Sequence, residues 1–313
     1  MTTATAIASG LRATWRAKWM VLIFFACNLF LAAAVAAPMH SAIADHLGNS
    51  AMGQQLVRGF DSSWLAEFEV ANAPFLKSFS IAIVYGSILF LVLNTVLSAG
   101  AFEWFWRREQ AARAGVEMNA SGFHIFGRGM GRYFLRFARI AIVASIFYFV
   151  AFWFWQMPVA NALDHLFEDS AVERWHFYLN WVRLALLIGS VVVISVVVDY
   201  AKADIAIDEH RSALAAIGHA AGFVVANFRR VVVIYGSLAV FATLTVFLYA
   251  TFARFFPQSS VGTVVVWFLV AQGLLWVRWM FRLASWGAAV AFYGAGRANL
   301  TTPVQETAMQ AQA

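Results

Sequence analysis

Six long apolar stretches constrain the fold of this chain more than any other feature. A helix that crosses a bilayer needs about 20 mostly apolar residues. The stretches that meet this requirement are 19–37, 79–105, 137–157, 177–198, 231–256 and 261–280. Only 12% of the residues are charged, against about 25% in a soluble domain. Because water would not solvate so much apolar surface, the sequence predicts an all-α, polytopic membrane helix bundle with six transmembrane helices.

The sixth apolar run is longer than one membrane crossing requires. It stays mostly apolar from Val261 to Ala295, but Arg278 and Arg282 interrupt it. We expect a span over 261–280, followed by an interfacial or cytoplasmic helical extension. Residues 1–297 then form a single transmembrane domain, and the polar residues 298–313 are predicted to be a disordered cytoplasmic tail.

The first apolar stretch has two interpretations. Basic residues precede it and small residues occupy 32–37, as in a signal peptide. However, the leader is long, Pro38 follows directly, and five further stretches come after it. We therefore expect an uncleaved signal anchor.

Lysines and arginines predict the orientation of the bundle, because they accumulate in cytoplasmic loops. Of the 22 in the chain, those assigned to the outside are Arg58, Lys77, Arg174, Arg183 and Arg254. We therefore expect N-in/C-in topology and a multi-pass protein of a bacterial inner (cytoplasmic) membrane. The formal charge of +6 reflects this asymmetry and does not indicate a nucleic-acid partner.

Proline placement supports the assigned span ends independently. Pro38, Pro74, Pro158 and Pro257 all lie at the predicted outer ends of apolar stretches. Proline in a helix interior costs about 3 kcal/mol. We therefore expect none of the six helices to contain a proline in its interior.

The two longer cytoplasmic connections, 107–136 and 201–230, have similar length and character. Residues 120–123 and 220–223 match at an offset of 100, and so do Glu109 and Glu209. An apolar stripe in the second connection, spaced by three or four residues, predicts an amphipathic cytoplasmic helix. Its members are Leu214, Ile217, Ala221, Val224 and Phe228. Duplication of a helix–amphipathic helix–helix unit and chance matching of alanine-rich helices both explain the similarity.

Residues 198–214, VDYAKADIAIDEHRSAL, resemble a signature of uncharacterised bacterial multi-helix membrane proteins, in which Asp-Tyr-Ala is followed by an Arg-Ser-Ala-Leu motif. There the signature joins two membrane helices and precedes an amphipathic segment. More loosely, the whole plan is similar to the membrane domain found with some glycerophosphodiester phosphodiesterases. The chain shows no phosphodiesterase catalytic domain, so the resemblance implies a fold and no activity.

The densest charge cluster lies within this signature. An ion-pair cluster is predicted for Asp199, Asp204, Asp208 and Arg211. In a helix that continues past Tyr200, Asp204 and Asp208 lie one turn apart, and Asp208 and Arg211 can pair at i,i+3. One interpretation is a latch to neighbouring helices through the arginines at 229–230. The other is a solvated helix surface.

Arg278 and Arg282 share a helix face at i,i+4 and are the predicted binding residues. In the bilayer centre both would have to face the bundle, because a buried charge is costly there. They would then bind an anionic group or pair with Glu103 or Asp199. Near the inner interface they would only anchor the helix.

The sequence shows no pattern for a catalytic or metal site. His40, Asp45 and His46 lie on one predicted outer loop, and Asp164 and His165 lie on another. These residue types bind zinc, but there is no HExxH motif and adjacent residues on a helix point apart. We expect no metal, no cofactor and no catalytic residues.

Three functions remain as hypotheses. The first is a non-enzymatic scaffold or assembly component, in contact with membrane lipids and membrane-protein partners. The second is a transporter or permease-like subunit that handles an anionic or lipid-like substrate through Arg278 and Arg282. The third is a lipid-modifying enzyme that uses the outer histidines, which requires His165 close to His40 or His46.

Overall fold

The computed structural model describes residues 1–48, 52, 61–118, 121–167, 173–210, 212–255 and 261–310, with side chains described except at 163–176, 261 and 298–310. The described chain is helical and contains no strand. Its helices are α1 (Thr3–Arg16), α2 (Lys18–Leu47), α4 (Ser62–Ala71), α5 (Ala73–Ala114), α6 (Gly122–Gln156), α7 (Pro158–Phe167), α8 (Glu173–Asp208), α9 (Ala213–Ala226), α10 (Phe228–Phe255) and α11 (Val261–Gln310).

Six of these helices, α2, α5, α6, α8, α10 and α11, are long and apolar enough to cross a membrane. Each of the six predicted spans lies within one of them to within one residue at its end, so the all-α, polytopic fold class is confirmed. The side of the membrane on which the termini lie stays a prediction, and so does the single-domain boundary at 297.

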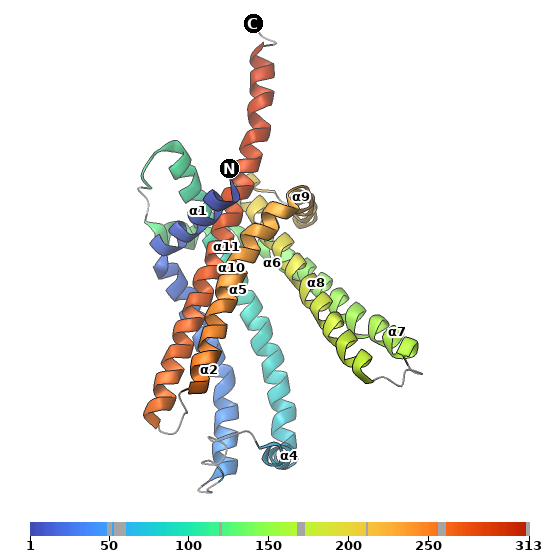
Figure 1. The fold of residues 1–313 in the computed structure, drawn as a ribbon. Coiled ribbons are helices and arrows are strands. Elements are labelled where there is room, and N and C mark those ends of the chain that lie inside the picture. The colour runs from blue at the N-terminus through green and yellow to red at the C-terminus, as the bar shows by residue number, and fades with distance from the viewer. Residues whose placement is uncertain are drawn as a thin grey trace.

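The spanning helices converge at one end of the molecule and diverge toward the other. Figure 1 shows α2 with α5, α6 with α8, and α10 with α11 spreading apart from a junction beside α1 and α9. The buried residues gather at that junction, over 97–105 of α5, 199–206 of α8 and 283–293 of α11. The diverging portions expose large apolar side chains such as Phe149 and Phe247. The core therefore lies at the convergent end.

Small residues let α1 pack directly against α11 at the junction. A Cβ atom on Gly10 would lie 2.3 Å from the carbonyl oxygen of Ala284 and 2.7 Å from the nitrogen of Ala288. Gly287 faces the Cα of Gly10 at a similar closeness. Such close backbone approach is typical of helix packing in membranes, where small residues line the interface.

The α5–α6 crossing uses the same device. A Cβ atom on Gly129 would lie 2.6 Å from Cβ of Glu103 and 2.9 Å from the carbonyl oxygen of Ala99. Gly100 is equally close to Phe126 of α6. The two glycines therefore fix where α5 and α6 cross.

Pro38 corrects the expectation that no spanning helix contains an interior proline. It lies inside α2, which continues for nine further residues to Leu47. Neighbouring groups can compensate for the lost backbone hydrogen bond in membrane helices. The extension also has a packing partner, because the ring of His46 contacts Phe68 of α4 at 5.2 Å between centroids.

The predicted apolar stripe of the second connection is buried only in part: Val224 is buried and Ile217 packs against the core. The buried residues are Ala213, Ala216, Ala220 and Val224. Leu214 is 67% exposed, and Phe228 is 58% exposed and belongs to α10. Small alanines allow α9 to approach its neighbours closely, whereas the larger Leu214 would hold it away. Closeness of packing, rather than side-chain hydrophobicity, selects the buried face.

The two matched connections also differ in structure. Within the first, α5 ends at Ala114 and Gly122 begins the long helix α6. In the second, α9 ends at Asn227 before α10 begins. Phe223 packs on Tyr293 of α11 at 4.7 Å between ring centroids, whereas its counterpart Phe123 is 64% exposed. Duplication stays a hypothesis.

The last helix continues beyond the predicted start of the tail. Helix α11 is described to Gln310 and so extends past residue 298, while the disorder of the tail stays a prediction. Its last turns are rich in Ala, Gln, Glu and Met, which are strong helix formers. Figure 1 shows this segment projecting past the junction.

Candidate functional site

The most connected polar group in the core is Asp199 of α8, which is fully buried. Arg282 of α11 reaches it with both terminal nitrogens, Nη1 at 2.8 Å from Oδ2 and Nη2 at 3.0 Å from Oδ1. The Trp286 indole N–H donates to Oδ1 at 2.9 Å, and the Tyr235 hydroxyl donates to Oδ2 at 3.2 Å. A two-pronged arginine–carboxylate pair with two further donors satisfies a buried carboxylate. We call these four residues the Asp199 centre.

Arg282 is held by more than its ion pair. Its guanidinium lies 5.1 Å from the centre of the Trp286 ring, one turn further along α11. Its Nη2 is also 3.5 Å from Oγ of Ser195, one turn before Asp199 on α8. A cation over an aromatic face is stabilised by the ring quadrupole. Both partners of the ion pair therefore have fixed positions.

Lys202 extends the polar core toward α5 and α6. Its Nζ donates to Oγ of Ser98 at 3.3 Å and lies 5.7 Å from the ring centres of both Phe137 and Trp286. The lysine thus links α8 to α5, α6 and α11 in one place. Aromatic faces and a hydroxyl provide its surroundings, with no ion pair to a carboxylate in the described chain.

A second cluster surrounds Asp204, five residues further along α8 and also fully buried. The hydroxyl of Tyr293 donates to its Oδ1 at 2.6 Å, and Nη2 of Arg297 donates to the same oxygen at 3.1 Å. Arg297 also pairs with Asp208 at 2.7 Å. Oδ2 of Asp204 has no hydrogen-bond partner. The helices α8 and α11 run parallel. Asp204 and Asp208 therefore contact α11 further along its sequence than Asp199 does, at Arg297.

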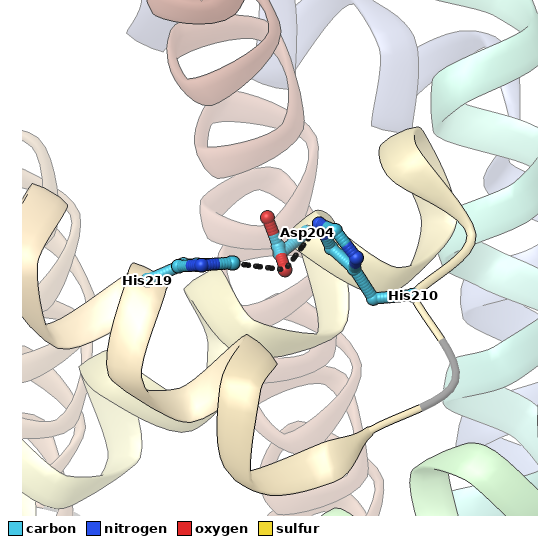
Figure 2. A group of neighbouring side chains, drawn as sticks. All are labelled: Asp204, His210 and His219. Atoms are coloured by element: carbon cyan, nitrogen blue, oxygen red, sulfur yellow. Dashed lines mark ion pairs between the residues drawn. The ribbon is translucent and has the colours of Figure 1, made fainter.

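Two histidines face the unpaired oxygen of Asp204. Nε2 of His210 is 3.8 Å from Oδ2, and Nδ1 of His219 is 3.7 Å from it. Figure 2 shows the two imidazoles on either side of the carboxylate, with His219 on α9 and His210 in the segment between α8 and α9. Together with Asp204 they could hold a metal ion. We call the three residues the Asp204 triad.

Asp199 and Arg282 lie about one membrane thickness from the residues at which the apolar spans of α8 and α11 begin. Asp199 follows Phe177 by 22 residues, which is about 33 Å of helix. Arg282 follows Val261 by 21 residues, or about 32 Å. The hydrocarbon core of a bilayer is about 30 Å thick. Helix length therefore favours a position for these charges at the membrane boundary of the convergent end, away from the bilayer midplane.

The two predicted binding arginines lie in different surroundings. Arg282 pairs with Asp199, which is one of the pairings considered from the sequence. Arg278 is exposed and forms no ion pair within the described residues. Glu103 pairs with Arg107 of its own helix at 3.0 Å, rather than with either of them. The shared helix face predicted from i,i+4 spacing therefore does not give a shared environment.

The predicted ion-pair cluster is present in part, with different partners. Asp199 pairs with Arg282, while Asp204 and Asp208 pair with Arg297. The expected partners at 229–230 are exposed on α10, so that part of the prediction is wrong. The physical reason is that α11, and not the start of α10, runs beside this part of α8. Arg211 lies outside the described residues, and so does its predicted pairing with Asp208.

The outer residues considered for catalysis are only partly described. His46 lies 3.4 Å from the side-chain amide of Asn72 and beside the rings of Trp64 and Phe68. The side chains of Asp164 and His165 lie outside the described part of the structure. The proposed approach of His165 to His40 or His46 stays untested.

Sequence reasoning missed several residues of these two groups, namely Tyr235, Trp286, Tyr293, Arg297, His210 and His219. A signal was present on the last apolar run. Arg282, Trp286, Tyr293 and Arg297 are spaced by four, seven and four residues, which places them along one helix face. A polar and aromatic stripe on a membrane helix indicates a buried polar seam.

The six apolar helices and their polar junction define a multi-pass α-helical membrane protein. Comparison with known proteins places it no more narrowly, because no family model, curated protein or solved structure matches this chain.

Proposed function

We propose that this chain is a non-enzymatic scaffold or assembly component of a bacterial inner membrane. The observation that carries the proposal is the contrast between its two ends. At the convergent end, the charge of Arg282 is neutralised by Asp199 and is not free for a substrate. At the diverging end, helix pairs expose broad, mostly apolar surfaces. Such a molecule is suited to holding other membrane helices.

The groove between α5 and α6 is the most defined part of that surface. Its volume is about 490 Å³. Its lining is mostly apolar and includes Leu91 and Val92 of α5 and Ile142, Ile146 and Phe149 of α6. Lipid acyl chains are as apolar as leucine side chains, so hydrophobicity alone does not favour a protein partner over lipid. A partner helix must bind through complementary shape and close packing. A groove between two diverging helices offers that shape to a third helix.

Site-specific photo-crosslinking in native membranes tests this proposal. A photoreactive residue at Ile146, which is 58% exposed in the groove, is expected to give one discrete protein adduct. Val225 on α9 is 76% exposed and serves as the matched control, with no such adduct. A photoreactive residue placed in the captured protein must, in the reciprocal experiment, give the same adduct with this chain. Lipid adducts alone at Ile146 would contradict the scaffold.

A transporter subunit for an anionic or lipid-like substrate is the second candidate. A cavity of about 340 Å³ between α1, α5 and α11 is lined by Arg12, Arg16 and Arg108, together with Glu109. Three arginines around one hollow favour an anionic group. Neither Arg278 nor Arg282 lines it, so this candidate shifts the anion site away from the residues predicted from the sequence.

Lipid retention separates the two candidates. In native mass spectra, the anion-binding function predicts that the chain retains phosphatidylglycerol over phosphatidylcholine, and that Arg12→Gln with Arg108→Gln removes the preference. The scaffold predicts that the same variant keeps its crosslink from Ile146. If this variant lost the crosslink but kept the lipid preference, the result would contradict both the scaffold and the anion-binding function.

A further inference from the structure

Oδ2 of Asp204 is one of the buried polar atoms of the junction that accept no hydrogen bond. The aspartate is fully buried, yet its Oδ2 has no hydrogen-bond partner. A buried acceptor without a partner destabilises a fold, and more so when it is charged. The two imidazole nitrogens that face it, at 3.7 and 3.8 Å, are too distant to donate to it. Charge-assisted hydrogen bonds are about 2.7–2.9 Å long.

This spacing is what two ligands of a common metal ion require. In tetrahedral zinc sites, His N and carboxylate O atoms lie about 2.0–2.2 Å from the metal, so the ligand atoms stand about 3.3 Å apart. The three atoms of the Asp204 triad all lie within 4.8 Å of one another. A point equidistant from three atoms 4.8 Å apart is about 2.8 Å from each. Small rotations of the exposed imidazoles would bring it to zinc distance.

The carboxylate is held in place from behind. Oδ1 of Asp204 accepts from Tyr293 and Arg297 of α11, which turns Oδ2 toward the histidines. Polar partners that orient a ligand in this manner are typical of metal sites, where they fix the ligand geometry. The carboxylate would not need to reorganise on binding.

The histidines are positioned by the turn between α8 and α9. Glu209 adopts a left-handed conformation with φ of 55°, which ends α8 and redirects the chain at His210. Arg136 donates to the Glu209 carbonyl at 3.0 Å, and Arg132 pairs with its carboxylate. Ser212 then caps α9 by accepting from the backbone N–H of Ala215 at 3.3 Å. These contacts place His219 opposite His210.

The local charge also suits a cation. Asp204 and Asp208 carry two negative charges, and Arg297 carries one positive charge between them. The two histidines are half-exposed, so an ion from the aqueous phase has a direct approach. Oδ2 of Asp208 is already paired with Arg297 at 2.7 Å, so water is the candidate for the fourth ligand position.

We infer that Asp204, His210 and His219 form a binding site for a divalent transition-metal ion, with Zn²⁺ favoured by the two-nitrogen, one-oxygen ligand set. Sequence reasoning did not predict this site, because its ligands follow no recognised spacing motif. The ion ties α9 to the end of α8, where Asp204 is in turn held by Tyr293 and Arg297 of α11. Its role is structural, since all three ligands come from elements that meet only at this junction. The site does not depend on the proposed scaffold function.

Zn²⁺ binding by the purified full-length chain in detergent tests the inference. Isothermal titration with ZnCl₂ is expected to give one ion per chain. His219→Gln and His210→Gln are expected to weaken binding at least tenfold. These side chains are half-exposed, so the variants should fold. His124→Gln is the matched control, because His124 is exposed on α6 and outside the triad, and it should bind as the unaltered chain does.

Co²⁺ distinguishes a built site from surface histidine binding. The triad is expected to give the visible absorption bands of four-coordinate Co²⁺, with addition of Zn²⁺ removing them, and Asp204→Asn should abolish the bands. Equal zinc affinity in the His219→Gln variant, binding of several ions without preference, or absence of binding in the micromolar range would each overturn the inference.

Discussion

Two aspartates five residues apart on α8 are both fully buried, but their carboxylates are satisfied to different degrees. Both oxygens of Asp199 accept hydrogen bonds, from Arg282, Trp286 and Tyr235. At Asp204 one oxygen accepts two hydrogen bonds and the other accepts none. The first carboxylate is closed by its surroundings, and the second is left open toward two histidines. The difference indicates that the Asp199 centre stabilises the fold, whereas the Asp204 triad can take a ligand.

The position of each carboxylate along α8 accounts for the difference. Around Asp199, α10 and α11 both lie close and supply donors from two sides. Around Asp204, α11 still supplies donors, but α9 supplies only His219, which is 50% exposed. The open oxygen thus lies where the packed bundle gives way to the connecting helix.

The largest effect is expected from removal of Arg282. Arg282→Met leaves Asp199 as a buried charge with only neutral donors, which costs about 3 kcal/mol of unfolding free energy. Reversible unfolding by SDS in mixed micelles measures this loss. Arg278→Met, four residues earlier on the same helix and exposed, is the matched control and should change stability by no more than about 0.5 kcal/mol.

The second-largest effect is expected from disruption of the close contact between α1 and α11. Gly10→Val places a side chain against the backbone of Ala284 and Ala288, which forces α1 and α11 apart and costs about 2 kcal/mol. Because α11 carries the donors of both carboxylates, the variant should also weaken zinc binding. Gly115→Ala is the control for a glycine without close neighbours. Its φ of 65° makes it mildly strained, so a cost near that of Gly10→Val would contradict the packing argument.

A smaller effect is expected at the open carboxylate. Asp204→Asn keeps an oxygen for Tyr293 and Arg297, and Arg297 keeps its pair with Asp208. The expected loss of stability in metal-free protein is about 1 kcal/mol. With saturating Zn²⁺ the unaltered chain gains stability and the variant does not, so the difference between them widens. An unchanged difference would show that no ion links α9 to the junction.

A similarly small effect is expected from loss of a single donor at the closed carboxylate. Trp286→Phe removes one N–H while Arg282 and Tyr235 continue to donate to Asp199. The expected cost is about 1 kcal/mol, that of one hydrogen bond. A loss as large as that of Arg282→Met would show that the indole, rather than the ion pair, dominates the centre.

The sequence predicts the spans and part of the charge network. Hydropathy identifies all six spanning helices, because the bilayer requires long apolar runs whatever the fold. The pair of Arg282 with Asp199 is among the expected pairings, because opposite charges near span ends attract each other. The pair of Arg297 with Asp204 is not predicted, because it depends on the parallel register of α8 and α11, which no local pattern specifies.

The errors share a cause with the missed residues. Leu214 belongs to the predicted apolar stripe but is 67% exposed, whereas α9 buries Ala216 and Ala220. Backbone proximity decides that choice, and it is a property of the assembled junction. The Asp204 triad is hidden for the same reason: its ligands at 204, 210 and 219 meet only because Glu209 turns the chain back.

The coupling between Asp199 and Arg282 tests the central claim most directly. Asp199→Asn, Arg282→Met and the double variant form a double-mutant cycle, followed by SDS unfolding in mixed micelles. If the two side chains form a closed ion pair, the double variant should lose less stability than the two single variants lose together. The expected coupling free energy is about 2 kcal/mol. Additive losses, within about 0.5 kcal/mol, would contradict the claim that these two side chains close the convergent end of the bundle.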